Sequence, residues 1–373
     1  MKTTELAAVR HRIQVAQPLP FNVRYADGSL LLAKGQVIAS EAELLSLLGR
    51  GAMVDLEELQ SEAERVRLAP RDLLPKLWAE GLDRVGQALM HAPHPSFKAA
   101  LDDAADPVLT LVERDPDLAI FQVLRQDANP NIEHGVMRSM NTAITAYLVA
   151  HRLAWTTAEC GKVFKVALTS NLSMLELQGE LSRQRTPPTE LQRAELQSHP
   201  LRSAVMLEHA GVADNDWLRA VARHHEVEDG SGYPTGCSDV GDLASLVRRA
   251  DIYTSKLCAR SHREAMSADI AGRQMFMQDP GHPMTAALVK EFGVYPPGCH
   301  VRLANGSTAI VVQRGPTVTT PIVCCLSAGN GTPLIKPLRV ETSHPDLAVV
   351  AVIGQRIVNP EATAERLMQL ALR

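Results

Sequence analysis

Helical periodicity between about residues 131 and 285 is the feature that most restricts the fold of this chain. Apolar side chains there recur at intervals of three and four residues, the spacing that places them on one face of a helix. Four segments share the pattern: 137–151, 163–177, 217–225 and 243–254. A bundle of helices, and not a sheet, is therefore predicted for the middle of the chain.

The sequence on either side of this bundle has a different pattern. Asp27-Gly28 and Asn305-Gly306 each separate two short β-rich runs, which is typical of a hairpin. Ser40 followed by Glu43 predicts the start of a short helix. We expect a mainly α fold in four regions: a small α/β amino-terminal unit of hairpin and helix (1–60), a helical connector (61–130), a helical domain (131–298), and a β-rich carboxy-terminal segment (299–373) with a last helix from Pro360.

Composition excludes several classes of protein. The formal net charge of −4 offers no basic surface for nucleic acid. The six cysteines include no C-x-x-C pair, which argues against a zinc finger or a disulfide framework and fits a reducing compartment. No signal peptide is recognisable, and no apolar run approaches the roughly 20 residues that span a bilayer. We expect a soluble, cytoplasmic protein without a membrane span.

The stretch HHEVEDGSGYPTG at 224–236 places two histidines just before a glycine-rich turn. Both can face the interior, because they lie three and four positions after Val221, which is on the apolar face of the preceding helix. Asp251 falls on an apolar stripe, where a buried carboxylate needs a partner. His199 precedes Pro200, which should make its helix bend or restart. His199, His224, His225 and Asp251 thus predict a metal site, although a buried His-Asp pair can also be an ordinary core interaction.

Three segments resemble the HD-GYP family, the HD-superfamily phosphodiesterases that hydrolyse cyclic di-GMP in bacteria. They are SHP at 198–200, HHEVEDGSGYPTG at 224–236 and RRADIYTSKLCARSHR at 248–263. The resemblance covers about 131–285 and implies the helical bundle of the HD superfamily. It also implies a centre of two or three iron or manganese ions, and it places four of the ligands at His199, His224, His225 and Asp251.

The remaining ligand positions depart from the family pattern. Arg138 stands at the position of the first histidine, Ser170 and Asn171 at the His-Asp doublet, and Met174 at the following lysine. Asparagine brings no charge and only a weak carbonyl ligand, and arginine is a permanent cation that repels a metal. Two-metal phosphoryl chemistry needs both ions. We therefore expect a residual site with at most one iron or manganese ion, and not a full two-metal centre.

The parts that face nucleotide in the family are better kept. Arg260 and Arg263 match a basic pair that meets phosphate, for which arginine is suited, although they could instead be a solvated helix end. The loop at the rim of the family's site, which also contacts partner proteins, is present in full: Asp229, Gly230, Gly232, Tyr233 and Pro234. Cyclic di-GMP, and a diguanylate cyclase or another signalling protein, are the partners that the resemblance implies.

The sequence thus predicts a cyclic di-GMP signalling protein with a degenerate HD-GYP domain, catalytically impaired, that binds nucleotide or a partner. Two alternatives stay open. One is an active phosphodiesterase with a reduced or substituted metal site, for which His134, one helical turn before Arg138, is the best substitute ligand. The other is a structural scaffold that forms a homodimer.

Removing Arg260 should weaken cyclic di-GMP binding more than removing His225, because a residual metal site offers phosphate little positive charge. Losing one charge-assisted contact is expected to cost about 1.5–3 kcal/mol, or roughly tenfold to a hundredfold in affinity. Calorimetric titration of the wild type, Arg260→Ala and His225→Ala measures the difference. A larger loss in the histidine variant would contradict this and indicate a functional metal.

Overall fold

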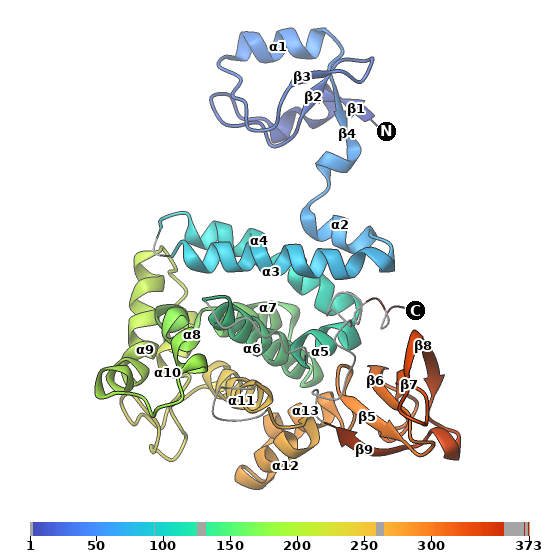
Figure 1. Ribbon diagram of the computed structural model, residues 1–373. Coiled ribbons are helices and arrows are strands. Elements are labelled where there is room, and N and C mark those ends of the chain that lie inside the picture. The colour runs from blue at the N-terminus through green and yellow to red at the C-terminus, as the bar shows by residue number, and fades with distance from the viewer. Residues whose placement is uncertain are drawn as a thin grey trace. The chain divides into compact units, whose positions relative to one another are not determined.

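A computed structural model describes residues 3–92, 94–124, 132–258, 265–353, 369 and 372. Arg260, Arg263 and the start of the predicted helix at Pro360 lie outside the described residues. The chain divides into two compact units, Met1–Ala69 and Pro70–Arg373, which are described separately (Figure 1). The boundaries at 60, 130 and 298 stay predictions.

The first unit is a small antiparallel sheet covered by a helix. Its strands lie in the order β1-β4-β2-β3, and β2 and β3 form the hairpin predicted at Asp27-Gly28. The side chain of Ser40 caps α1 as predicted, whereas the Glu43 carboxylate accepts from the N–H of Ala39 and not of Ser40. The elements are β1 (Thr3–Glu5), η1 (Leu6–Arg12), β2 (Val23–Arg24), β3 (Leu30–Leu32), α1 (Glu41–Gly49), β4 (Met53–Asp55), η2 (Leu56–Leu59) and α2 (Glu62–Leu68).

This unit has a hydrophobic core of its own, which includes Leu6, Phe21, Val23, Ile38 and Val54. All five side chains are almost completely buried. A separate core of this kind is the mark of a domain that can fold alone.

Residues 1–69 expressed alone should therefore fold. Dispersed amide resonances and a cooperative thermal transition are the expected readouts. Val23→Asp is the control, because an unpaired carboxylate at a position with 0% exposure should unfold the fragment. A wild-type fragment without dispersed resonances would contradict the expectation.

The second unit is mainly helical. Its helices are η3 (Arg71–Leu73), α3 (Leu74–Met90), α4 (Phe97–Arg114), α5 (Pro116–Leu124), α6 (Ile132–Arg152), α7 (Thr157–Thr169), η4 (Leu172–Met174), α8 (Leu175–Arg183), α9 (Glu190–His209), α10 (Asn215–Arg223), α11 (Asp242–Leu257), α12 (Ala268–Gln278) and α13 (Pro283–Phe292). In the described part of the chain no helix is both long and apolar enough to cross a bilayer.

Helix α6 is the centre of the bundle. It packs against α3, α5, α7, α8, α11 and α13 (Figure 1). Neighbours surround it, so several of its polar side chains are buried: Ser139, Thr142 and Thr145 have no exposed surface. The position of α11 against α6 brings Asp251 beside Arg138, and this contact shapes the site described below.

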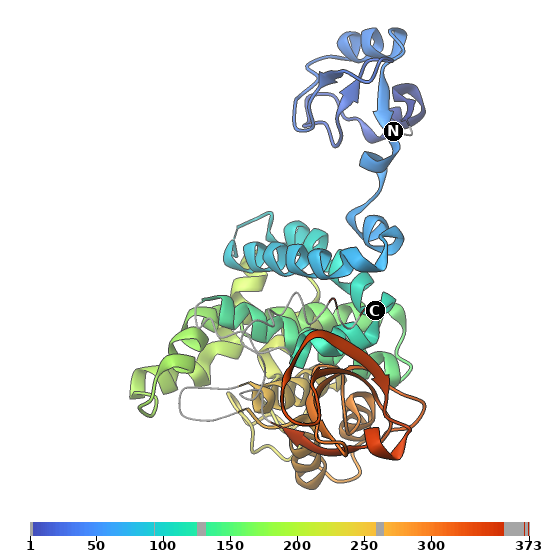
Figure 2. The same ribbon diagram turned by 45° about the vertical axis from the view of Figure 1, so that its right-hand side comes forward.

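A curled five-stranded sheet follows the bundle (Figure 2). Its strands lie in the order β8-β7-β6-β5-β9 and pair antiparallel, with the predicted hairpin at Asn305-Gly306 joining β5 to β6. The elements are β5 (His300–Leu303), β6 (Thr308–Gln313), β7 (Ile322–Ser327), β8 (Pro333–Glu341), η5 (Pro345–Leu347) and β9 (Val349–Ile353). The predicted fold class, a mainly α bundle with a small unit before it and a β-rich segment after it, is confirmed.

Candidate metal and nucleotide site

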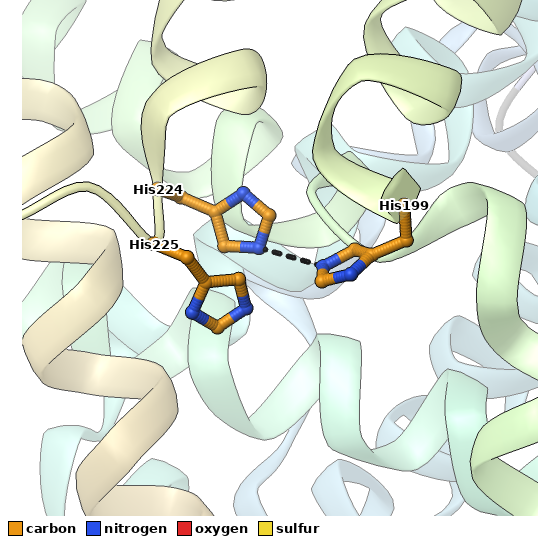
Figure 3. A group of neighbouring side chains, drawn as sticks. All are labelled: His199, His224 and His225. Atoms are coloured by element: carbon orange, nitrogen blue, oxygen red, sulfur yellow. Dashed lines mark hydrogen bonds between the residues drawn. The ribbon is translucent and has the colours of Figure 1, made fainter. Parts of the chain in front are cut away.

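Three histidines meet inside the helical bundle (Figure 3). His199 comes from α9, and His224 and His225 follow the last residue of α10. One ring nitrogen from each lies within 4.8 Å of the others. His199 and His224 have no exposed surface, and His225 is half-buried. Of the four ligands predicted from the sequence, these three come together.

Backbone carbonyls fix the tautomers of two of the rings. The sequence predicted that the helix would bend or restart at Pro200. The restart did not occur, because α9 continues through Pro200 to His209. Since proline has no N–H, the carbonyl four residues earlier, that of Leu196, lacks its helical donor. The Nδ1 of His199 lies 2.7 Å from this oxygen and donates to it.

The Nδ1 of His224 is held in the same way, 2.7 Å from the carbonyl of Val221 in the last turn of α10. A carbonyl only accepts, so both rings carry their proton on Nδ1 and present an unprotonated Nε2. This is the arrangement in which metal-bound histidines are usually found.

The two Nε2 atoms lie 3.2 Å apart and face each other. With both lone pairs unprotonated, the contact is unfavourable unless a cation lies near both. A shared proton is disfavoured: burial, and then the neighbouring His224, lower the pKa of His199 to about 3, and burial also lowers the pKa of His224. A metal ion about 2.0–2.1 Å from two imidazole nitrogens holds them roughly 3 Å apart, so the residues fit one ion.

Asp251 is not a member of this histidine group and pairs instead with Arg138. Its Oδ1 accepts from the guanidinium at 2.7 Å, and both side chains are almost fully buried. Burial, the largest influence, raises the pKa of Asp251, but the charge and hydrogen bond of Arg138 together with the nearby His224 and His199 outweigh it and keep this pKa below the usual value. The carboxylate is thus ionised and already paired. A permanent cation holds the last ligand that the family pattern would offer to a metal.

The other positions that depart from the family pattern are also buried. Ser170 and Asn171 have no exposed surface, and Met174 is nearly buried. The Asn171 Oδ1 has no hydrogen-bond partner among the described residues, so this oxygen could accept from a ligand or coordinate an ion weakly. Ser173, in η4, contacts α9, because its hydroxyl donates to the carbonyl of His199 at 3.1 Å. His134 is not part of the histidine group found among the described residues.

The glycine-rich loop is packed onto the histidines. The ring of Tyr233 stacks on that of His225, with centroids 4.6 Å apart and planes 16° from parallel. A Cβ on Gly232 would lie 2.4 Å from the backbone nitrogen of Val227, so only glycine permits the close approach. Of the remaining loop positions, Asp229 is exposed and accepts from the N–H of Ser231 at 2.9 Å, and Gly230 and Pro234 are half-buried.

Glu226 anchors this loop, a role that the sequence analysis missed. Its carboxylate is completely buried and accepts from the N–H and the hydroxyl of Thr235, both at 2.7 Å, and from the N–H of Cys237 at 3.1 Å. The glutamate of the motif therefore binds the backbone and the Thr235 hydroxyl of its own loop. Its place next to two inward-facing histidines could have suggested that it also points inward.

Comparisons with known proteins bear on the family and the fold of the helical domain. Residues 122–271 match the family model of the HD domain. A curated cyclic di-GMP phosphodiesterase from Pseudomonas aeruginosa is 32% identical over 131 residues, which is 34% of this chain and 31% of that protein. The chain thus matches about a third of the length of this relative.

A solved structure extends the likeness of fold. It is an HDG"Y"P protein from Bdellovibrio bacteriovorus, with a TM-score of 0.50 and 15% identity, and the match covers 78% of this chain and 98% of that one. Residues 122–271 belong to the HD domain family. With its GYP loop complete, the domain is of the HD-GYP type predicted from the sequence.

Metal-free protein should lose stability in mild acid. The unfolded chain binds a proton at His199 near the ordinary pKa of 6.5, whereas the folded chain binds it only near 3. Stability from this group is therefore complete above pH 6.5 and falls as the pH drops toward 3. From pH 7 to 5 the free energy of unfolding should decrease on the order of 2 kcal/mol more in the wild type than in His199→Gln.

Urea unfolding of chelator-treated protein at a series of pH values measures this difference. His209→Gln is the control, because His209 is exposed on the same helix. Equal pH dependence in the wild type and His199→Gln would show that the ring is not held neutral by the fold.

Proposed function

We propose that this protein acts in cyclic di-GMP signalling by binding, with an HD-GYP domain that has lost hydrolytic competence. Cyclic di-GMP, a diguanylate cyclase or another signalling protein is the partner. The observation that carries the proposal is the ion pair of Arg138 with Asp251. In place of a second metal ion, the site has a protein cation bound to the carboxylate that such an ion would use.

The balance of charge supports this proposal. A second ion next to the histidines would meet the guanidinium of Arg138 and neutral side chains at Ser170 and Asn171. Removing Arg138 alone would not repair the site, since it leaves the buried Asp251 without a partner, a change that costs about 3–5 kcal/mol in comparable cases. Arg138, at the position of a family ligand, is therefore needed for the stability of the core.

His199, His224 and His225 would hold a single ion, with iron or manganese proposed from the family resemblance. Bound there, the ion would supply positive charge to a phosphate oxygen. The three rings orient one another, and the neutral tautomers of His199 and His224 require no loss of a proton at neutral pH.

A second candidate function is hydrolysis with this reduced site. The observation in its favour is the histidine group itself, which has lost none of its three members. The two candidates differ in what they require of the metal. Binding of nucleotide or protein can proceed with one ion or none, whereas hydrolysis at this reduced site requires the one ion that the three histidines can hold.

Purified protein should contain clearly fewer than two tightly bound metal ions per chain and should show no appreciable hydrolysis of cyclic di-GMP. Elemental analysis after anaerobic purification and a hydrolysis assay with added iron or manganese test both parts. The His224→Ala, His225→Ala double variant is the control, because it should lose the remaining metal. Steady turnover that the double variant abolishes would favour the second candidate, and two or more ions per chain would contradict the reduced site itself.

A variant that restores the family's ligands sharpens this test. Arg138→His, Ser170→His and Asn171→Asp together free Asp251 and add three ligands, so they should raise the metal content per chain. An unchanged metal content in a folded triple variant would contradict the assignment of these positions.

A further inference from the structure

Two consecutive arginines on α11, Arg248 and Arg249, have opposite surroundings. Adjacent residues of a helix point about 100° apart. Arg249 points into the core and is saturated: it bonds Asp279 at 2.8 Å and 2.9 Å and the carbonyl of Ser245 at 3.0 Å, and it pairs with Glu228 at 3.3 Å. It is a structural residue.

Arg248 has no such partners. It is half-buried, and among the residues that the structure describes no hydrogen bond or ion pair reaches its guanidinium. Three carboxylates lie within range of its charge, but each has other contacts. Glu228 and Asp279 bind Arg249, and Asp229 accepts from the N–H of Ser231.

Arg248 also lies on the helix that carries Asp251. It lies one helical turn before Asp251, so the two residues share a face of α11. Hydrogen bonds from Ser231, and after them the charge of Arg248, lower the pKa of Asp229 in the glycine-rich loop. Arg248 is therefore placed between the loop and the site.

A half-buried arginine without a carboxylate partner is suited to an anion that arrives from solution. Guanidinium groups bind phosphate oxygens through two parallel N–H donors. The site has lost positive charge relative to a two-metal centre, and the charge of Arg138 is committed to Asp251. A phosphodiester that enters beside His225 would meet Arg248 as an available cation among the residues that the structure describes.

We propose that Arg248 contacts a phosphate of cyclic di-GMP at the rim of the histidine site. This inference rests on the proposed function, because it needs the dinucleotide to bind in this domain. Arg248 is a binding residue here, and no hydrolytic step is attributed to it. An arginine can also be half-buried simply because its stem covers apolar surface, and the experiment separates these roles.

Calorimetric titration of the full chain with cyclic di-GMP tests the proposal in four proteins. They are the wild type, Arg248→Ala, Arg248→Lys and Arg219→Ala. Arg219 is the matched control, an exposed arginine of α10 that pairs with Asp216 at 2.7 Å. Arg248→Ala should lose roughly tenfold to a hundredfold in affinity, Arg248→Lys should lose less, and Arg219→Ala should bind like the wild type.

The metal content and the thermal unfolding midpoint of each protein are measured alongside, so that a lost ion or a damaged fold is recognised. If Arg248→Ala unfolds, Arg248→Gln, which keeps a long polar stem, takes its place with the same expectation. Wild-type binding that persists unchanged in Arg248→Ala overturns this inference and leaves the proposed function standing. A wild type that does not bind cyclic di-GMP overturns the inference together with nucleotide binding as the proposed function.

Discussion

The buried ion pair of Arg138 and Asp251 joins the two helices on which the site is built. It links α6, the central helix, to α11 across 113 residues of sequence. Two charges taken out of water gain little net stability from their attraction, but each makes the other indispensable. The pair therefore fixes the side-chain direction of Asp251 and the charge of the interior at once. A ligand that binds beside the histidines therefore meets no net charge from Arg138 and Asp251, because the two charges cancel.

Proline controls the other side of the site. Pro200 removes one backbone donor from α9, and the ring of His199 supplies the missing bond to the Leu196 carbonyl. The His199-Pro200 pair thereby keeps the Leu196 carbonyl hydrogen-bonded and fixes which nitrogen of His199 carries the proton. At His224 the end of α10 has the equivalent effect, because the last carbonyls of a helix lack partners within it. Local backbone chemistry, and not a distant carboxylate, prepares both rings.

The sequence was sufficient for the elements and for the histidines, because both depend on short-range patterns. Apolar spacing predicted the helices, and His-Pro and His-His fixed three side chains relative to their own backbone. The direction of Asp251 was not predictable, since it depends on a partner 113 residues away. Nor could the sequence separate Arg248 from Arg249, which are identical neighbours. Their difference arises only when α11 is packed, because Arg249 then binds Asp279 and Thr285 whereas no described residue forms a hydrogen bond or ion pair with Arg248.

Arg314, at the end of β6, reaches back to the helical bundle. It binds Asp117 on α5 and Glu291 on α13, and Glu291 also binds Arg152 on α6. Asp117 and Arg314 are 197 residues apart, so during synthesis the carboxylate emerges long before its cation. Contacts between such distant parts of a chain slow folding, because the intervening segment must first be ordered. During synthesis, Asp117 on α5 and Glu291 on α13 therefore cannot pair with Arg314 until β6 has left the ribosome.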